Sequence, residues 1–420
     1  MRRLILPALL LTAALWAGAQ TSYNEIIASP DKAAGLYYLY PVTESANTPA
    51  PKGYKPFYIS HYGRHGSRYL VGDEQYADPL AIFIAADKAG VLTEKGKDVK
   101  QRLENIWLDA AERSGELTEK GVSQHKGIAG RMYKSFPEVF KGDPAISAKS
   151  TTRMRCAHSM MAFCEALKEL DPKLDIHKES AMRYMKYLST TSPRARSYAP
   201  EGAARSAAFE SEIVQPERLM STLFKEPRFP ESQGKTSNWL MLNLFRIAID
   251  APNTECPERL DDLFTPDEIF KMWQNYNYHY YNEMGNPTSA DGAILDNARP
   301  LLENILECAD AAIASGKNGA DLRFGHDSTL VPLTGLMKID GCYGSTDDPH
   351  RLHEVYADYQ ISPMAANVQL IFFRDKNNDV IVKVMLNERE VSLPVATDIA
   401  PYYHWNDLRN YFTEILENQK

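Results

Sequence analysis

The chain has 420 residues, a hydrophobic fraction of 44% and a formal net charge of −8 at neutral pH. This length is typical of two domains, or of one domain with a large insertion, and the hydrophobic fraction is ordinary for a globular protein with a sizeable core. The negative charge provides no positive field that would attract nucleic acid or anionic lipid. We therefore expect no nucleic-acid partner, and any anionic ligand must be held by a local basic pocket.

The N-terminus has the pattern of an export signal. Two arginines at positions 2 and 3 are followed by an apolar run over residues 4–16, and Ala17-Gly18-Ala19 provides the small residues of a cleavage site. A buried N-terminal helix is the alternative. We predict a signal peptide over residues 1–19, cleaved near Ala19, and a secreted, periplasmic protein. No later stretch is long and apolar enough to predict a membrane span.

The sequence has five cysteines, and no two of them have the spacing of a CxxC motif. An oxidising compartment permits a disulfide, but an odd number leaves at least one free thiol. Cys156 and Cys164 lie on one predicted helix and cannot bond to each other. A buried, apolar state is expected for the set, which comprises Cys156, Cys164, Cys256, Cys308 and Cys342.

Residues 20–55 are mixed in character and contain proline, which predicts an extended N-terminal arm. A strand over 57–60 follows, a helix begins near Thr118, a second strand covers 145–148, and another helix covers 154–170. Strands that alternate with helices in this way imply right-handed crossovers and a mainly parallel sheet.

The pattern changes near residue 181, after which helical segments and many aromatic residues follow without strand alternation until about residue 295. We predict an α/β fold with a mainly parallel sheet flanked by helices. Residues 20–180 and 296–420 form its main domain, and 181–295 form a helical cap insertion. The remaining expected elements are helices over 295–314, 329–337 and 405–416, a strand over 322–325, and a hairpin of strands over 367–373 and 380–386.

Two sequence elements carry the side chains that phosphoryl transfer requires, and each follows a predicted strand. The reaction needs a nucleophile, cations around the phosphoryl oxygens and an acid for the leaving group. Arg64-His65-Gly66-Ser67-Arg68 provides one imidazole between two guanidiniums, each able to bind phosphate through two hydrogen bonds. Gly66 allows the backbone to bend so that these side chains converge. The carboxyl edge of a parallel sheet is also where such crevices open.

The second element, Phe324-Gly325-His326-Asp327, also leads from a strand into a helix. Asp327 can serve as the general acid, and His326 can donate a hydrogen bond to phosphate. A third cation comes from Arg153 or Arg155, at the start of the helix over 154–170. Free N–H groups and the helix dipole also favour an anion there.

These elements resemble those of the histidine acid phosphatases, branch 2 of the histidine phosphatases, a family that includes phytases and multiple inositol polyphosphate phosphatases. Residues 64–68 match the RHGxR element of the family, and His326-Asp327 match its HD element. Phe163 lies eight residues after Arg155, as in the family's helix that carries a distal pocket arginine, which favours Arg155 over Arg153. The resemblance implies a core like that of phosphoglycerate mutase.

Segments 324–333 and 384–394 look most like the inositol polyphosphate phosphatase subgroup, but two positions depart from the family pattern. Leu70 stands where the family usually has proline, which we expect to alter the loop exit and not the chemistry. The chain has His-Asp-Ser at 326–328 where the subgroup usually has His-Ala-Glu. The second departure favours phytase or general acid phosphatase chemistry.

The mechanism that the resemblance implies begins with attack of neutral His65 on phosphorus, while an acceptor such as a backbone carbonyl holds its other ring nitrogen. The phosphohistidine that forms is then hydrolysed by water. Asp327 protonates the leaving oxygen and then activates the water. No metal or cofactor is required. The residues that hold the phosphoryl oxygens are Arg64, Arg68, Arg155 and His326.

The predicted function is hydrolysis of small phosphomonoesters, with inositol polyphosphates or phytate as the substrate. A broad-specificity acid phosphatase is one alternative, and a non-catalytic protein that binds inositol phosphates is another. The presence of both His65 and Asp327 argues against the second, because binding alone requires only the arginines. A mutase-like phosphoryl transferase shares the histidine chemistry, but its usual substrates are cytosolic and the predicted export argues against it.

A basic segment at the start of the predicted cap contains Arg183, Lys186, Arg194 and Arg196. These side chains are possible ligands of distal phosphates on the substrate, and a solvated basic surface loop is the alternative. Contacts of this kind would act only on a substrate that carries more than one phosphate.

Overall fold

The computed structural model describes residues 22–42 and 47–418, so the predicted signal peptide lies outside the described residues. Its centre is one mixed β-sheet with the strand order β3-β2-β4-β1-β5-β6-β7, in which β8 pairs with β6. The first four strands of this order are parallel, and the others are antiparallel to their neighbours. The strands are β1 (Lys55–Arg64), β2 (Ala145–Ser150), β3 (Ile176–Ser180), β4 (Gly319–Gly325), β5 (Asn367–Arg374), β6 (Val380–Leu386), β7 (Arg389–Glu390) and β8 (Tyr402–His404).

Three neighbouring strands end at the same edge of this sheet. Arg64, the last residue of β1, is paired with Gly325 at the end of β4. Ser150 at the end of β2 is paired with Phe324 of the same strand. β1 is buried from Phe57 onward, as expected for a central strand that is covered on both faces. The register therefore brings together the three segments that carry the predicted site.

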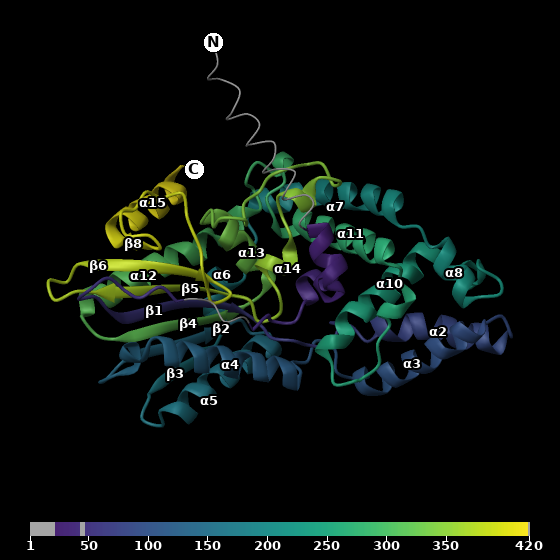
Figure 1. The fold of residues 1–420 in the computed structure, drawn as a ribbon, viewed down its shortest axis with the longest axis horizontal. Coiled ribbons are helices and arrows are strands. Elements are labelled where there is room, and N and C mark those ends of the chain that lie inside the picture. Colours follow the sequence, from purple (N-terminus) through teal and green to yellow (C-terminus); the bar gives the residue numbers. More distant parts are fainter. Residues whose placement is uncertain (1–21, 43–46, 419–420) are drawn as a thin grey trace, which may run out of the picture.

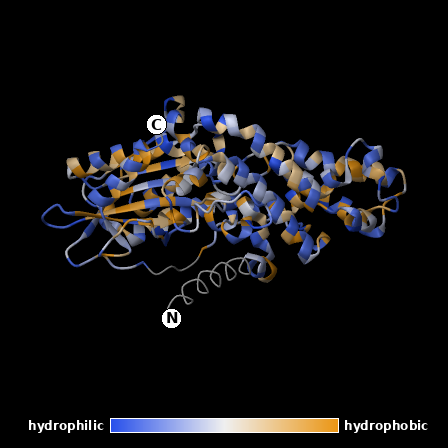
Figure 2. Ribbon diagram, turned by 90° about the horizontal axis from the view of Figure 1, so that it is seen from above, coloured by the Kyte–Doolittle hydropathy of each residue, from blue (hydrophilic) through white to orange (hydrophobic). Residues whose placement is uncertain are grey.

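Helices cover both faces of the sheet (Figure 1). α4 (Glu119–Ser135) and α5 (Met154–Leu170) lie against one face, and α12 (Arg299–Ser315) and α15 (Trp405–Glu417) against the other. Thr118 caps α4 as the sequence predicts, since its side chain accepts a hydrogen bond from the N–H of the third helical residue. In Figure 2 the strands are predominantly hydrophobic and the surrounding helices alternate in hydropathy. The predicted α/β fold class is confirmed.

The remaining helices form a second, helical part of the molecule, on the right in Figure 1. α2 and α3 pack together and contact α10 and α8. Residues 74–110, which the sequence analysis assigned to the main α/β domain, therefore lie with helices of the predicted cap. The helices of this part are α2 (Glu74–Lys88), α3 (Glu94–Ala110), α7 (Pro193–Ile213), α8 (Glu217–Leu223), α9 (Phe229–Ser232), α10 (Ser237–Asp250) and α11 (Pro266–Met284).

Two segments differ from the sequence prediction. The expected extended arm contains a 3-10 helix, η1 (Pro30–Tyr37), which has proline in its first turn and packs against α10 and α11. The helix expected over 295–314 begins as a separate 3-10 turn, Leu295–Ala298, and α12 starts at Arg299 because a proline occupies its first turn. Three further helices are α6 (Met185–Leu188), α13 (Asp327–Leu336) and α14 (Asp358–Ile361).

The predicted hairpin is confirmed, since β5 and β6 are antiparallel neighbours and the Asp375 side chain accepts hydrogen bonds from the N–H groups of Asn377 and Asp379 between them. All five cysteines are free thiols. Within the described residues, no helix is both long enough and apolar enough to cross a membrane.

Candidate active site

His65 lies at the carboxyl edge of the sheet, directly after β1, and is 1% exposed. Its N–H donates to the carbonyl of Gly325 at 3.0 Å, and its carbonyl accepts from the N–H of Ala365, also at 3.0 Å. The histidine is therefore fixed through its backbone between the end of β4 and the segment that leads into β5.

The imidazole of His65 has one tautomer that its surroundings favour. Its Nδ1 lies 2.9 Å from the carbonyl oxygen of Gly66. A carbonyl oxygen only accepts, so Nδ1 carries the proton and Nε2 keeps its lone pair. Burial lowers the pKa of His65 well below its usual value, and the charges of Arg64, Arg155 and Arg68 lower it further. The ring is consequently neutral and has a free nitrogen at ordinary pH.

Gly66 is required by close packing. A Cβ atom there would lie 2.6 Å from the carbonyl oxygen of Gly121 in the first turn of α4, and one on Gly121 would lie 2.3 Å from the carbonyl oxygen of Ser67. The N–H of Gly66 donates to the hydroxyl of Ser159 on α5. The sequence analysis expected a bend at Gly66; the structure adds that two glycines let this loop rest directly on α4.

Arg64 is held from three directions and is 1% exposed. Its Nη1 donates to the carbonyl oxygens of Leu36 at 2.5 Å and Ser362 at 2.7 Å. Its Nη2 forms an ion pair with Oδ2 of Asp327 at 2.7 Å. The fixed guanidinium therefore joins the two predicted sequence elements across the sheet edge.

His326 and Asp327 stand where β4 passes into α13. The N–H of His326 donates to the hydroxyl of Tyr62, and its Nε2 lies 3.3 Å from the hydroxyl of Thr151. The His65 and His326 rings have centroids 5.6 Å apart. Burial and the charge of Arg155 lower the pKa of His326 to about 4.

Asp327 is the first residue of α13, and its Oδ1 accepts from the N–H of Ser328 at 2.8 Å. Burial raises the pKa of this carboxyl, but Arg64, His326 and Arg68 outweigh burial, so the pKa lies below its usual value. The carboxylate is therefore ionised in the absence of ligand.

Arg68 and Arg155 complete the cluster, and neither forms an ion pair within the described residues. Arg68 donates to the carbonyl of Tyr69, and its guanidinium carbon lies 5.2 Å from the ring centroid of Tyr37. Arg155 is partly buried and lowers the pKa of both His65 and His326, whereas exposed Arg153 lowers the pKa of His326 less than Arg155 does. Arg155 therefore acts more strongly on His326 than Arg153 does, and the choice of Arg155 as the pocket arginine stays a prediction.

Three arginines, Arg64, Arg68 and Arg155, therefore surround the neutral imidazole of His65 at the end of three strands, and one of them, Arg64, is paired with the Asp327 carboxylate. This arrangement can hold a tetrahedral dianion while a nitrogen approaches its central atom. A sequence model described as the histidine phosphatase superfamily (branch 2) matches residues 63–387, which include both elements. The chain belongs to branch 2 of the histidine phosphatase superfamily. The predicted family is confirmed, and the protein is a phosphomonoesterase.

Solved structures of other phosphatases have the same fold as this histidine phosphatase. The multiple inositol polyphosphate phosphatase of Bifidobacterium longum in complex with phosphate has 20% sequence identity and a TM-score of 0.77, over 93% of this chain and 98% of that chain. The same enzyme in complex with inositol hexasulfate has 20% sequence identity and a TM-score of 0.76, over 91% of this chain and 97% of that chain. A phytase from D. castellii has 15% sequence identity and a TM-score of 0.71, over 92% of this chain and 85% of that chain. No curated protein matches the chain in sequence.

The predicted distal cations of this phosphatase differ in whether their charge is already paired. Arg183 is exposed and pairs with Glu179. Arg194 pairs with Asp296 at 2.8 Å. Lys186 and Arg196 are exposed, and neither takes part in an ion pair within the described residues.

Lys186 lies on α6, a short helix that borders the site. The Sδ atom of Met185, its neighbour in the helix, lies 4.0 Å from the hydroxyl of Thr152, just before α5. The carbonyl of Leu188 accepts a hydrogen bond from Thr329, two residues after Asp327. Among the predicted distal residues, Lys186 therefore combines a position next to the site with an unpaired charge.

The sequence analysis missed Asp250, a fully buried carboxyl group at the end of α10. Its Oδ2 accepts from the hydroxyl of Tyr76 at 2.5 Å, and that hydroxyl accepts from the N–H of Leu70 at 2.9 Å. Burial raises the pKa of Asp250 to about 7, although the charge of Arg68 acts against this. The signal in the sequence that could have identified Asp250 is an acidic residue at the end of a strongly apolar helix.

The same hydrogen bonds explain the first departure from the family pattern. The N–H of Leu70 donates to the hydroxyl of Tyr76, and this hydroxyl donates to Asp250, which lies near Arg68. Proline has no N–H and could not form the first of these hydrogen bonds. Leucine at position 70 thus connects the loop that follows β1 to α10 of the helical part.

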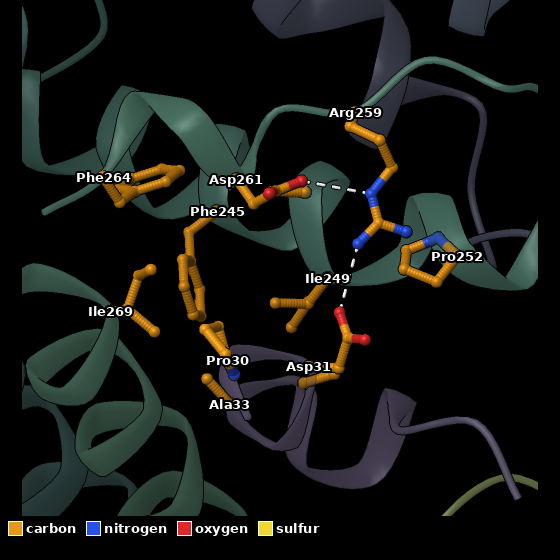
Figure 3. A pocket seen from close by; sticks show the side chains of 12 residues that line it. Pro30, Asp31, Ala33, Phe245, Ile249, Pro252, Arg259, Asp261, Phe264 and Ile269 are labelled. Atoms are coloured by element: carbon orange, nitrogen blue, oxygen red, sulfur yellow. Dashed lines mark hydrogen bonds and ion pairs between the residues drawn. The ribbon is translucent and has the colours of Figure 1, made fainter. Parts of the chain in front are cut away.

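A separate pocket lies between η1 and α10 (Figure 3). Its walls are mainly apolar, and Arg259 pairs with both Asp31 and Asp261 beside it. The residues that line this pocket include no histidine, cysteine, serine or threonine. Its two carboxylates, Asp31 and Asp261, are both paired with Arg259, and the cluster around His65 remains the candidate active site.

Proposed function

We propose that this phosphatase is an exported enzyme that hydrolyses inositol polyphosphates, with phytate as the principal substrate, through a phosphohistidine on His65. The observation that carries the proposal is the fixed, neutral imidazole, with Nδ1 bound to the Gly66 carbonyl and Nε2 free beside the arginines. The substrate class is supported by the shared fold of a phosphatase whose name refers to inositol polyphosphates and of two phytases.

The first chemical step forms a bond between Nε2 of His65 and phosphorus and breaks the bond from phosphorus to the ester oxygen. Asp327 gives its proton to that oxygen, so the alcohol leaves uncharged. Water then attacks phosphorus, its proton passes to Asp327, and the N–P bond breaks to release phosphate. The phosphoryl oxygens are held throughout by Arg64, Arg68, Arg155 and His326.

The ion pair between Arg64 and Asp327 provides a way to create the acid when substrate binds. In the free enzyme, Arg64 keeps the pKa of Asp327 low and the carboxyl ionised. A bound phosphate dianion takes over the guanidinium and adds negative charge nearby, and both effects raise the pKa of Asp327. Substrate binding thus favours the protonated form that the leaving group needs.

The proposed periplasmic location depends on the sequence of residues 1–19 alone. Fractionation of cells that express the full chain, followed by N-terminal sequencing of the mature protein, tests it. Cleavage near Ala19 and recovery outside the cytoplasm are expected, and an intact N-terminus would contradict the proposal.

Phosphate release from phytate and from p-nitrophenyl phosphate tests the proposed chemistry. His65→Ala should abolish both activities, and acid-quenched wild type should carry acid-labile phosphate. His158→Ala removes an exposed histidine of α5 and is the matched control, with wild-type rates expected. Retention of a tenth of wild-type activity by His65→Ala, about 1.4 kcal/mol of barrier, would rule out the mechanism.

A substrate panel separates phytate from the alternatives. The proposal expects kcat/KM to be higher for phytate than for sugar phosphates and nucleotides. Similar values across the panel would identify a broad-specificity acid phosphatase, and binding without any turnover would identify a non-catalytic binding protein.

A further inference from the structure

Helix α10 carries two charged side chains, Arg246 and Asp250, on the same face. Asp250, its last residue, acts on Arg68 of the loop that follows β1. Arg246 precedes Asp250 by one helical turn. Residues four apart lie on the same face of an α-helix, about 6 Å apart along its axis. Arg246 therefore lies one helical turn before Asp250, the residue of α10 that acts on Arg68.

The guanidinium of Arg246 is partly buried, and within the described part of the chain it forms no ion pair with a carboxylate. Its Nη1 forms a long hydrogen bond, 3.4 Å, with the side-chain oxygen of Asn243, and its guanidinium also interacts with the hydroxyl of Tyr276. Its guanidinium carbon lies 5.8 Å from the ring centroid of Tyr276. Burial of a cation without a counterion destabilises the folded state, and a bound anion would remove this destabilisation.

Two phenols link this cation to the active site. Tyr37, the last residue of η1, lies under the guanidinium of Arg68, 5.2 Å from its carbon to the ring centroid. Burial lowers the pKa of Arg246, but Tyr276, Tyr280 and Tyr37 outweigh burial and raise it. Tyr37 and Tyr280 thus act electrostatically on Arg246, and the ring of Tyr280, on α11, has its centroid 6.1 Å from that of Tyr276.

We propose that Arg246, together with the hydroxyls of Tyr37 and Tyr280, binds a second phosphate of a polyphosphorylated substrate while its first phosphate lies on Arg68. The cation supplies charge, and the phenols supply donors whose rings are already held by packing. A spacing of one helical turn suits two phosphates on the same small ring. The inference rests on the proposed function for its substrate class, and it is separate from α6, which borders the site through Thr152 and Thr329.

Inhibition of p-nitrophenyl phosphate hydrolysis by two anions tests the subsite. Inositol hexasulfate presents several anionic groups on one ring, whereas inorganic phosphate presents a single group. Arg246→Gln should raise the inhibition constant of inositol hexasulfate about tenfold and that of inorganic phosphate much less, and added salt should reduce the difference. Arg228→Gln, which removes an exposed arginine before α9, is the matched control and should change neither constant.

Equal changes in the two inhibition constants, or no change in either, would overturn the subsite. Tyr280→Phe removes one hydroxyl and keeps the ring, so it should weaken inositol hexasulfate selectively even if Arg246→Gln fails to fold. Arg246→Lys should restore part of the selective binding, because it restores the charge. If wild type does not hydrolyse phytate but these selective effects persist, the proposed substrate is wrong and the anion subsite stands.

Discussion

The ion pair between Arg64 and Asp327 makes phosphate compete with a carboxylate for one guanidinium. Asp327→Asn keeps the side-chain size and removes the charge, while Arg64 stays held by its two backbone acceptors. The pair is partly buried, with 1% of the Arg64 side chain and 21% of the Asp327 side chain exposed. Such a contact contributes about 1–2 kcal/mol, between an exposed ion pair and a buried charge-assisted hydrogen bond. We therefore expect the variant to bind inorganic phosphate about tenfold more tightly than wild type.

The inhibition constant of phosphate against p-nitrophenyl phosphate hydrolysis measures this effect, because that leaving group scarcely needs a proton and turnover persists. Turnover of an alkyl phosphate by the same variant should fall about 100-fold or more, since its alkoxide must be protonated. Asp310→Asn breaks an ion pair with Arg409 outside the site and should change neither value. Unchanged or weaker phosphate binding would show that Asp327 does not compete for Arg64, and equal losses on both esters would remove it from the acid role.

Because burial and three arginines lower the pKa of His65, kcat/KM for p-nitrophenyl phosphate should not fall between about pH 7 and pH 5; a decline centred near pH 6.5 would refute a neutral nucleophile. Lys186→Gln should raise KM for phytate about fivefold. Arg183→Gln should raise it less, because Arg183 is already paired with Glu179. An equal rise in KM for p-nitrophenyl phosphate would show that α6 does not recognise a second phosphate. His125 is buried with neither ring nitrogen bonded, and burial lowers its pKa to about 3, so its folded form stays neutral while the unfolded chain binds a proton. Stability should therefore fall as pH drops below about 6.5, by up to about 1.4 kcal/mol per pH unit from this group, and urea unfolding of His125→Phe should show a smaller pH dependence than wild type.

The sequence predicts the sheet and the position of its motifs because both depend on local patterns. Strand and helix periodicity place residues 64–68 and 326–327 after two strands, and parallel strands end at one edge. α5 has the predicted bounds for the same reason, since its apolar face repeats at the helical period. The catalytic roles of these residues stay predictions until variants are measured.

The contacts of η1 and α10 with the site could not be predicted, because they join segments far apart in the chain. Asn253, just beyond α10, donates to the carbonyl of Tyr37 across 216 positions. Hydrophobic periodicity identifies the apolar face of a helix but not the partner that covers it. The isolated charges at 246 and 250 in an apolar helix indicate a special environment, and only the fold shows that Asp250 is linked through Tyr76 to Leu70, just after residues 64–68.

The absence of a cysteine cross-link among the five thiols has a practical consequence for handling the enzyme. Burial raises the pKa of Cys156, Cys164 and Cys342 to about 12, and since the thiolate is the reactive form, these side chains react slowly with oxidants and alkylating reagents. The folded state therefore needs no oxidative step and no disulfide isomerase. A chain that starts after residue 19 can be produced and refolded in the presence of a reductant, with the same stability as in an oxidising buffer.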